Sequence, residues 1–130
     1  MFSPAPAAPQ YAPPADPIVY GCNDHSTLGL TGLSGPLKGR IYRVRGDGLT
    51  VGRDYDCGVR FAPGTPGISR HHCSIRWYRG GPALVDLSSG CGSFLSDGRQ
   101  LPPNFPTPLQ VGSRFYLGDP QYMFQLVQLS

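Results

Sequence analysis

Hydrophobic and polar residues alternate in short runs along most of the chain after residue 17, and glycines or prolines separate these runs. A period of two is typical of a strand that buries one face, and it recurs at intervals of roughly ten residues. No stretch of about a dozen residues has the spacing of an amphipathic helix without an interior glycine or proline. The pattern therefore predicts an all-β domain.

The clearest element is a hairpin, in which the runs 73–78 and 83–87 flank a turn at 80–82. Ile75 and Trp77 share one face of its first strand, so we expect Trp77 to face the core and not a ligand. Further strands are expected in the runs 28–33, 41–44, 49–51, 59–61, 94–95, 115–117 and 122–127. Together the runs predict an antiparallel β-sandwich of two sheets with about ten or eleven short strands.

The predicted domain occupies residues 18–130. Residues 1–17 are dominated by proline and alanine, which cannot build a core, and we expect a disordered linker or tail there. A second hypothesis is that Pro4–Pro9 forms a ligand for a proline-binding partner. Within the domain, the proline-containing stretches 62–67 and 101–108 are expected to be irregular.

The charge of the chain argues against nucleic acid as a partner. Eleven basic and eight acidic residues give a net charge of +3, which is too small and too scattered for duplex binding. No apolar run approaches ~18 residues and no signal peptide is evident, so we expect no membrane insertion by this chain. The prediction is a cytoplasmic domain, which a longer protein could still tether to a membrane.

The four cysteines do not follow a metal-binding or disulfide-scaffold pattern. They are Cys22, Cys57, Cys73 and Cys91, and no two of them have C-x-x-C spacing or a histidine pair to complete a zinc motif. We therefore expect reduced thiols, no metal and no cofactor.

Three polar segments, each next to a strand-like run, carry the candidate chemistry. They are Gly52–Arg53, Ser69–His72 and Asp86–Phe94. Turns that combine arginine, hydroxyls and free backbone N–H groups can form an anion pocket on a rigid β scaffold. Because a guanidinium fork matches phosphate oxygens, the segments predict recognition of a phosphate. Nothing in them indicates turnover of one.

These segments resemble the forkhead-associated domain in order and spacing. The matching blocks are Leu49–Asp54, Ile68–His72, Asp86–Ser89, Gly92–Phe94 and Gly98, with similar opening and closing segments at Leu33–Gly39 and Phe115–Gly118. The match extends over roughly residues 27–129. The resemblance implies an eleven-stranded, SMAD-like β-sandwich that binds phosphothreonine peptides through loops at one end. It also implies no catalytic activity and no cofactor.

The resemblance assigns roles to the first two segments. Arg53 is expected to be a direct phosphate ligand, Ser69 to donate its hydroxyl to phosphate, and Arg70 to act as a second cation. His72 is expected to brace the loops through backbone hydrogen bonds, with Gly52 as further structural support. The simpler interpretation of Arg53 and Arg70 is that each is a solvated surface arginine, and the simpler interpretation of Ser69 is that it forms a turn.

The third segment departs from the family pattern. Ser89, Gly90 and Cys91 occupy peptide-binding slots, and Gly92 is expected to support the site. Cys91 replaces an asparagine that normally bonds the peptide backbone, and Gly90 lacks the usual hydroxyl. The Cys91 thiol is also a candidate for oxidation. The simpler interpretation is that Cys91 is a small residue that the turn tolerates.

The sequence is compatible with three functions to different degrees. The preferred hypothesis is a non-catalytic adaptor for a phosphothreonine-containing protein, either a Ser/Thr kinase or its substrate. Gly90 and Cys91 favour an alternative, a phosphate-independent assembly module of the same fold. A phosphatase using Cys91 would need a phosphate loop running into a helix and a general acid, and the sequence provides neither.

Overall fold

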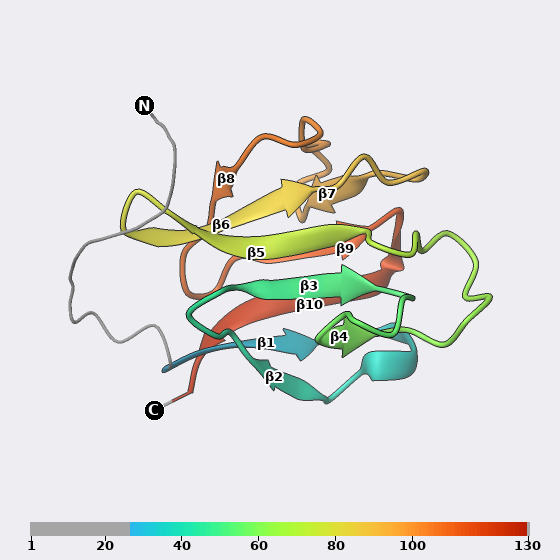
Figure 1. Ribbon diagram of the computed structural model, residues 1–130, viewed down its shortest axis with the longest axis horizontal. Helices are drawn as coiled ribbons and strands as arrows, with labels where there is room; N and C mark the ends of the chain where they lie inside the picture. Colours follow the sequence, from blue (N-terminus) through green and yellow to red (C-terminus); the bar gives the residue numbers. More distant parts are fainter. Residues whose placement is uncertain (1–26, 130) are drawn as a thin grey trace.

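The computed structural model describes residues 27–129, and the predicted tail at 1–17 and the predicted domain start lie outside them. The described residues form two five-stranded sheets and one 3₁₀ helix, η2 (Gly35–Leu37) (Figure 1). The first sheet has the order β2 (Ile41–Arg43), β1 (Leu28–Gly32), β10 (Asp119–Gln128), β9 (Arg114–Leu117), β7 (Ser93–Leu95). The second has the order β4 (Val59–Arg60), β3 (Leu49–Gly52), β5 (Cys73–Tyr78), β6 (Gly81–Asp86), β8 (Thr107–Pro108). This arrangement confirms the two-sheet β-sandwich.

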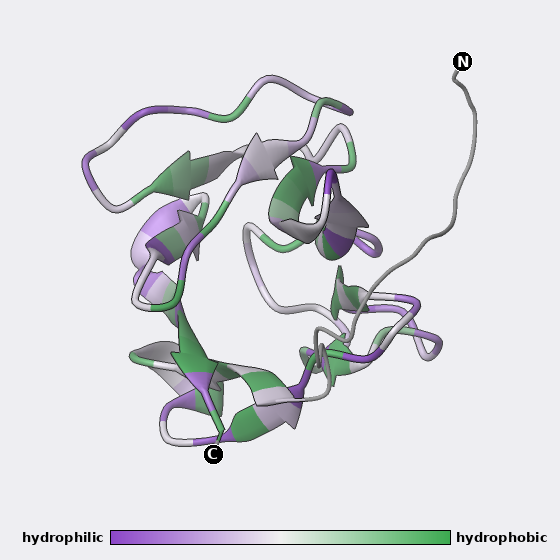
Figure 2. Cartoon of the chain, turned by 90° about the vertical axis from the view of Figure 1, so that its left-hand side faces the viewer, coloured by the Kyte–Doolittle hydropathy of each residue, from purple (hydrophilic) through white to green (hydrophobic). Residues whose placement is uncertain are grey.

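The core lies between the sheets and is formed by alternate residues of the strands. Seen nearly along the strands, the elements surround this interior (Figure 2). Its most deeply buried side chains are each at most 1% exposed: Leu30, Val44, Val51, Val59, Phe61, Ile75, Leu84, Phe115, Leu117, Phe124 and Leu126. Trp77 is half-buried and packs against this cluster, in agreement with its predicted orientation. Burial of this alternating apolar set is the main force that holds the two sheets together.

Three details differ from the sequence prediction. The described residues contain ten strands, not eleven, and β3 and β4 pair in parallel through Val51 and Val59. The parallel pair arises because the chain turns back between the two strands, so that the Phe61 N–H reaches the Gly52 carbonyl at 2.8 Å. Residues 107–108, expected to be irregular, form β8 against β6. Two-residue strands such as β4 and β8 are too short to show an alternating pattern.

β10 also begins earlier than the expected run 122–127. Part of the gap between that run and the run 115–117 is the start of this strand, with a shift in pairing register between Asp119 and Met123. The Ser34 hydroxyl covers the irregular stretch, because it donates to the Pro120 carbonyl at 2.8 Å and accepts the Met123 N–H at 3.0 Å. A bulge of this kind keeps the strand continuous although it contains a proline.

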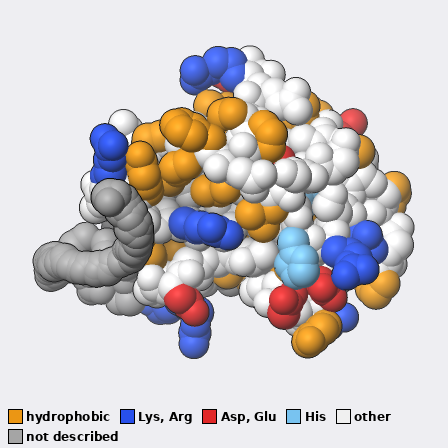
Figure 3. Space-filling model, turned by 45° about the horizontal axis from the view of Figure 1, so that its top comes forward, with side chains coloured by type: hydrophobic (Ala, Val, Ile, Leu, Met, Phe, Trp, Pro, Cys, Tyr) orange, Lys and Arg blue, Asp and Glu red, His pale blue; other side chains and the backbone are white. Residues whose placement is uncertain are grey.

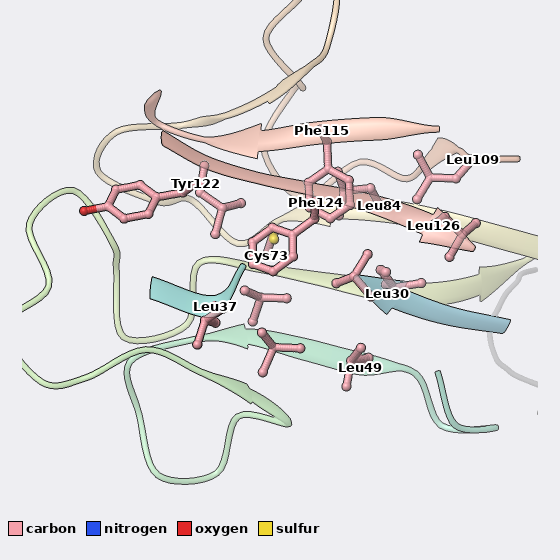
Figure 4. Close-up of a cluster of buried hydrophobic side chains, with 14 of the residues drawn as sticks. Leu30, Leu37, Leu49, Cys73, Leu84, Leu109, Phe115, Tyr122, Phe124 and Leu126 are labelled. Atoms are coloured by element: carbon pink, nitrogen blue, oxygen red, sulfur yellow. The ribbon is translucent and has the colours of Figure 1, made fainter. Parts of the chain in front are cut away.

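Several strand ends meet at one end of the sandwich, where Figure 1 shows the long connections after β3 and β4. Val51 of β3 pairs with Cys73 of β5, and Cys73 pairs with Asp86 of β6, so β3 and β6 end where β5 begins. The Tyr122 side chain points out of the core cluster (Figure 4) and its hydroxyl donates to the Pro66 carbonyl at 3.1 Å. This contact ties the β4–β5 connection to β10, so the loops that follow rest on a fixed base.

Candidate functional site

Arg53 directly follows β3 and lies along the segment 68–70. Its backbone N–H donates to the carbonyls of Ser69 (3.2 Å) and Arg70 (3.0 Å). Its side-chain Nε donates to the Ile68 carbonyl at 2.5 Å. Within residues 27–129 no partner is recorded for the two Nη groups of Arg53, which leaves these donors available to an anion.

Gly52 permits this close approach of the two segments. A Cβ atom at Gly52 would lie 2.1 Å from the Arg70 carbonyl oxygen and 2.8 Å from its carbon. Both are backbone atoms, which a side-chain rotation cannot move away. Glycine is therefore required where Arg53 enters the site, which gives a physical basis for its expected supporting role.

Ser69 joins two of the predicted segments. Its hydroxyl oxygen accepts a hydrogen bond from the backbone N–H of Gly90 at 3.1 Å. The hydroxyl therefore acts as an acceptor toward Gly90 and retains its own proton as a donor for a ligand. The structure thus brings together Arg53, Ser69 and Gly90. The Arg70 side chain is exposed beside them, with no partner recorded in the described part of the chain.

His72 is fully buried and fixes the positions of both loops. Its Nδ1 accepts the Ser69 N–H at 3.1 Å, so the ring proton resides on Nε2, which donates to the Gly92 carbonyl at 2.8 Å. Burial lowers the pKa of His72, and this effect outweighs the opposing influence of the Gly92 carbonyl and of Asp86. A neutral histidine that joins Ser69 to Gly92 fits the bracing role implied by the resemblance.

Asp86 organises the third segment, and the sequence analysis gave it no role. The side chain is 3% exposed, and one oxygen accepts the hydroxyls of Ser89 and Ser93, each at 2.6 Å. The other oxygen accepts the Ser89 N–H at 3.1 Å. Serine three residues after an aspartate is a known turn pattern, and it is the sequence signal that would have indicated this bracing role.

This arrangement changes the interpretation of Ser89. Both the hydroxyl proton and the N–H of Ser89 are directed at Asp86. In this conformation Ser89 holds the loop and presents no donor to a phosphate. Its direct contact with a peptide stays a prediction.

Cys91 is exposed and lies over two glycines of neighbouring loops. A Cβ on Gly118 would lie 3.0 Å from the Cys91 Cβ, and one on Gly67 would lie 4.0 Å from the Cys91 Sγ. A Cβ on Gly90, in contrast, would have no atom within 4 Å. Gly92 has φ +82, and its carbonyl accepts the Gly118 N–H at 2.9 Å. Gly90 therefore occupies an open position and Cys91 an exposed position packed beside Gly118, whereas Gly92 is constrained.

The structure is thus a two-sheet β-sandwich in which an arginine and a serine hydroxyl lie together on loops at one end. A family model of the FHA domain matches residues 49–118. The chain belongs to the FHA domain family. Among residues 27–129, no helix is both long enough and apolar enough to cross a membrane.

Solved structures agree with this assignment. One from a study of phosphothreonine-dependent FHA domain interactions is 27% identical, with 78% of this chain and 95% of the other covered and a TM-score of 0.62. The FHA domain of FhaA, in complex with the intracellular domain of Rv3910, is 27% identical, with coverages of 76% and 98% and a TM-score of 0.60. An Arabidopsis thaliana FHA domain is 26% identical, with coverages of 86% and 95% and a TM-score of 0.69. The sequence has no significant match among curated proteins.

Proposed function

We propose that this domain is a non-catalytic adaptor that binds phosphothreonine peptides at the loop end of the sandwich. The observation that carries the proposal is the convergence of Arg53 and Ser69. The segment that bears Ser69 accepts the Arg53 Nε and backbone N–H, while the Ser69 hydroxyl retains a donor. Because phosphate carries about −1.5 to −2 charges at neutral pH, these donors fit a phosphorylated side chain.

The magnitude of the interaction is sufficient for a signalling contact. Charge-assisted hydrogen bonds contribute about 1.5–3 kcal/mol each, so three of them supply about 5–9 kcal/mol before the cost of association. That range is consistent with a complex of about micromolar affinity. Arg53, Ser69 and either Arg70 or a backbone N–H would provide the three contacts. Most of the binding energy therefore depends on the phosphate.

The related structures support both the ligand and the kind of partner. One of them comes from phosphothreonine-dependent FHA domain interactions, and another holds an intracellular domain as its partner. We infer a phosphothreonine-containing partner, either a Ser/Thr kinase or its substrate, with no nucleic acid and no membrane insertion. Free thiols at Cys57, Cys73 and Cys91 fit a reducing, cytoplasmic location. We place the domain boundary at residue 18 and assign no enzymatic activity to it.

Gly90 and Cys91 favour one alternative function. Gly90 lacks the hydroxyl, and Cys91 the side-chain amide, that the family pattern uses to hold the peptide. A domain without these contacts would bind its partner through other surface residues and would not require a phosphate. This is the same fold acting as a phosphate-independent assembly module. The two functions differ in whether binding requires phosphorylation.

The test is a binding screen with degenerate peptides that have phosphothreonine, phosphoserine or threonine at a fixed central position. The proposal predicts retention of the phosphothreonine pool alone, and loss of the signal after phosphatase treatment of that pool. Equal retention of the threonine pool would support the assembly module instead. A folded domain that retains none of the pools would contradict the adaptor function.

A further inference from the structure

A second cluster of polar side chains lies on the loops that border the candidate phosphate site. His71 Nε2 is 2.8 Å from Asp56 Oδ1 and 3.5 Å from Asp54 Oδ2. Cys57 Sγ is 4.0 Å from Asp56 Oδ1. The side chains of His71 and Asp56 are 41% and 56% exposed, so the cluster is open to solvent on one side and bounded by the buried Cys57 on the other. Figure 3 shows histidine and acidic side chains gathered in one place on the surface.

The donor atoms of this cluster are already close to the separation that a bound cation requires. The candidate ligand atoms of Asp56, Cys57 and His71 all lie within 4.8 Å of one another. Ligands of a tetrahedral zinc ion are about 3.3–3.8 Å apart, given metal–ligand bonds of roughly 2.0–2.3 Å. The Cys57 thiol donates to the Arg70 carbonyl at 3.3 Å, and on metal binding its sulfur would exchange this bond for the cation.

The donor set selects the class of cation. It consists of an imidazole nitrogen, a thiol sulfur and a carboxylate oxygen, which together suit Zn²⁺ and similar borderline ions. Ca²⁺ and Mg²⁺ prefer oxygen ligands, so the sulfur and nitrogen exclude them. The carboxylate and a thiolate would supply the negative charge that a divalent cation requires of its ligands.

We propose that Asp56, Cys57 and His71 bind Zn²⁺ or a chemically similar divalent cation, with Asp54 as the fourth ligand. Asp54 Oδ1 accepts the Tyr55 N–H at 3.0 Å, which directs Oδ2 toward His71. On binding, the Sγ–H bond of Cys57 breaks, a sulfur–metal bond forms and the proton passes to solvent. No oxidant or reductant takes part.

The backbone of the loops favours this site. The ligand-bearing segments are already joined by backbone bonds, since the Asp54 N–H donates to the Arg70 carbonyl and the Cys57 N–H to the Asp54 carbonyl. Little conformational entropy would therefore be lost on binding.

The sequence does not indicate this cluster, because the spacing of Asp56, Cys57 and His71 follows no zinc motif. Asp56 and Cys57 precede His71 by about fifteen residues, and only the return of the chain through β4 brings them together. The proposal does not depend on phosphopeptide binding. Each can fail without affecting the other.

The test is titration of the metal-free 130-residue chain with Co²⁺, followed by displacement with Zn²⁺. We expect one ion per chain, with a near-ultraviolet thiolate-to-cobalt charge-transfer band that Zn²⁺ abolishes. Cys57→Ser should eliminate that band. His71→Asn and Asp56→Asn should each weaken Zn²⁺ binding at least tenfold, as measured by calorimetry. Both of the latter changes are at exposed side chains, so circular dichroism should show a folded protein even if Cys57→Ser unfolds.

Matched controls separate this site from other thiols and acids. Cys91→Ser, Cys22→Ser and Asp97→Asn should each leave both the charge-transfer band and the Zn²⁺ affinity unchanged. Absence of metal binding by the wild-type chain would overturn the proposal. So would binding that survives His71→Asn and Asp56→Asn, or that disappears with Cys91→Ser or Cys22→Ser.

Discussion

The side-chain Nε of Arg53 donates a hydrogen bond to the carbonyl oxygen of Ile68, the residue immediately before Ser69. This bond orients the Arg53 guanidinium along the loop that carries Ser69 before any ligand arrives. A long arginine side chain otherwise loses about 1.5–2 kcal/mol of rotamer entropy when it is immobilised. The preformed contact reduces that cost and gives the site one geometry for an incoming anion.

The first prediction concerns the space beside Gly52. Gly52→Ala should lower the free energy of unfolding by about 2–4 kcal/mol, because its Cβ would overlap the Arg70 backbone. Gly46, at the opposite end of β3, is the matched control, since a Cβ there meets no atom within 4 Å. Urea unfolding of both variants measures the difference. Equal effects of the two substitutions would mean that the close approach at Gly52 is not a constraint.

The second prediction concerns pH and His72. Because burial lowers the pKa of His72 below its ordinary value of 6.5, the unfolded chain binds a proton that the folded chain does not. The stability contributed by His72 is therefore complete above pH 6.5 and is lost as the pH falls toward its folded-state pKa. In that window the free energy of unfolding falls by at most about 1.4 kcal/mol per pH unit.

A comparison of unfolding curves at about pH 7.5 and pH 5 tests this linkage. Wild-type protein should lose more stability between the two conditions than the variant His72→Gln, which has no imidazole at this position. The other histidines are common to both proteins, so the difference between the two losses isolates His72. Equal losses would show that His72 does not resist protonation in the folded state.

The third prediction concerns the acceptor at Asp86. Asp86→Ala should leave the hydroxyls of Ser89 and Ser93 without their acceptor, and Ser93 is fully buried. We expect the free energy of unfolding to fall by about 2–4 kcal/mol, together with faster amide hydrogen exchange in residues 88–93. Asp97→Ala removes the exposed contacts of one carboxylate with the side chain and backbone N–H of Arg99, and we expect neither quantity to change measurably. Unchanged exchange in the loop would contradict a bracing role for Asp86.

The sequence predicts the sandwich well because its strands are long enough to alternate. The 73–78 strand and its hairpin partner show a buried face directly, and glycine-containing turns separate the strands. The strands β4 and β8 have only two residues each, too few for a period to appear. Their pairing is decided by neighbouring strands and not by their own composition.

The site residues also fall into those that the sequence predicts and those that it does not. Arg53, Ser69 and His72 could be predicted because each lies in a sequence block that matches the family pattern. The contact between Asp86 and Ser93 could not be predicted, because it depends on where the Ser93 hydroxyl lies after folding. The cluster around His71 was missed for a similar reason, since Asp56 and Cys57 precede β4, His71 follows it, and the two segments meet only in the folded chain. Residue type is visible in a sequence, whereas the distance between loops is not.

The fourth prediction concerns the departure at Cys91. By resemblance, asparagine at this position bonds the peptide backbone, so Cys91→Asn should add one or two neutral hydrogen bonds. At about 0.5–1.5 kcal/mol for one such bond, affinity for a phosphothreonine peptide should rise roughly 2- to 10-fold. Cys91→Ala removes the thiol without adding an amide, and its affinity should equal that of the wild type. Fluorescence anisotropy gives both values, and equal affinities for the two variants would place Cys91 outside the peptide groove.

The most direct test of the phosphate site is calorimetry with a phosphothreonine peptide selected from the degenerate pool. Arg53→Ala should weaken binding by at least about 2 kcal/mol, roughly 30-fold, while the unfolding transition stays close to that of the wild type. Arg45→Ala, an exposed arginine at the opposite end of β3, is the matched control and should bind as the wild type does. Retention of wild-type affinity by a folded Arg53→Ala protein would contradict the assignment of Arg53 as the phosphate ligand.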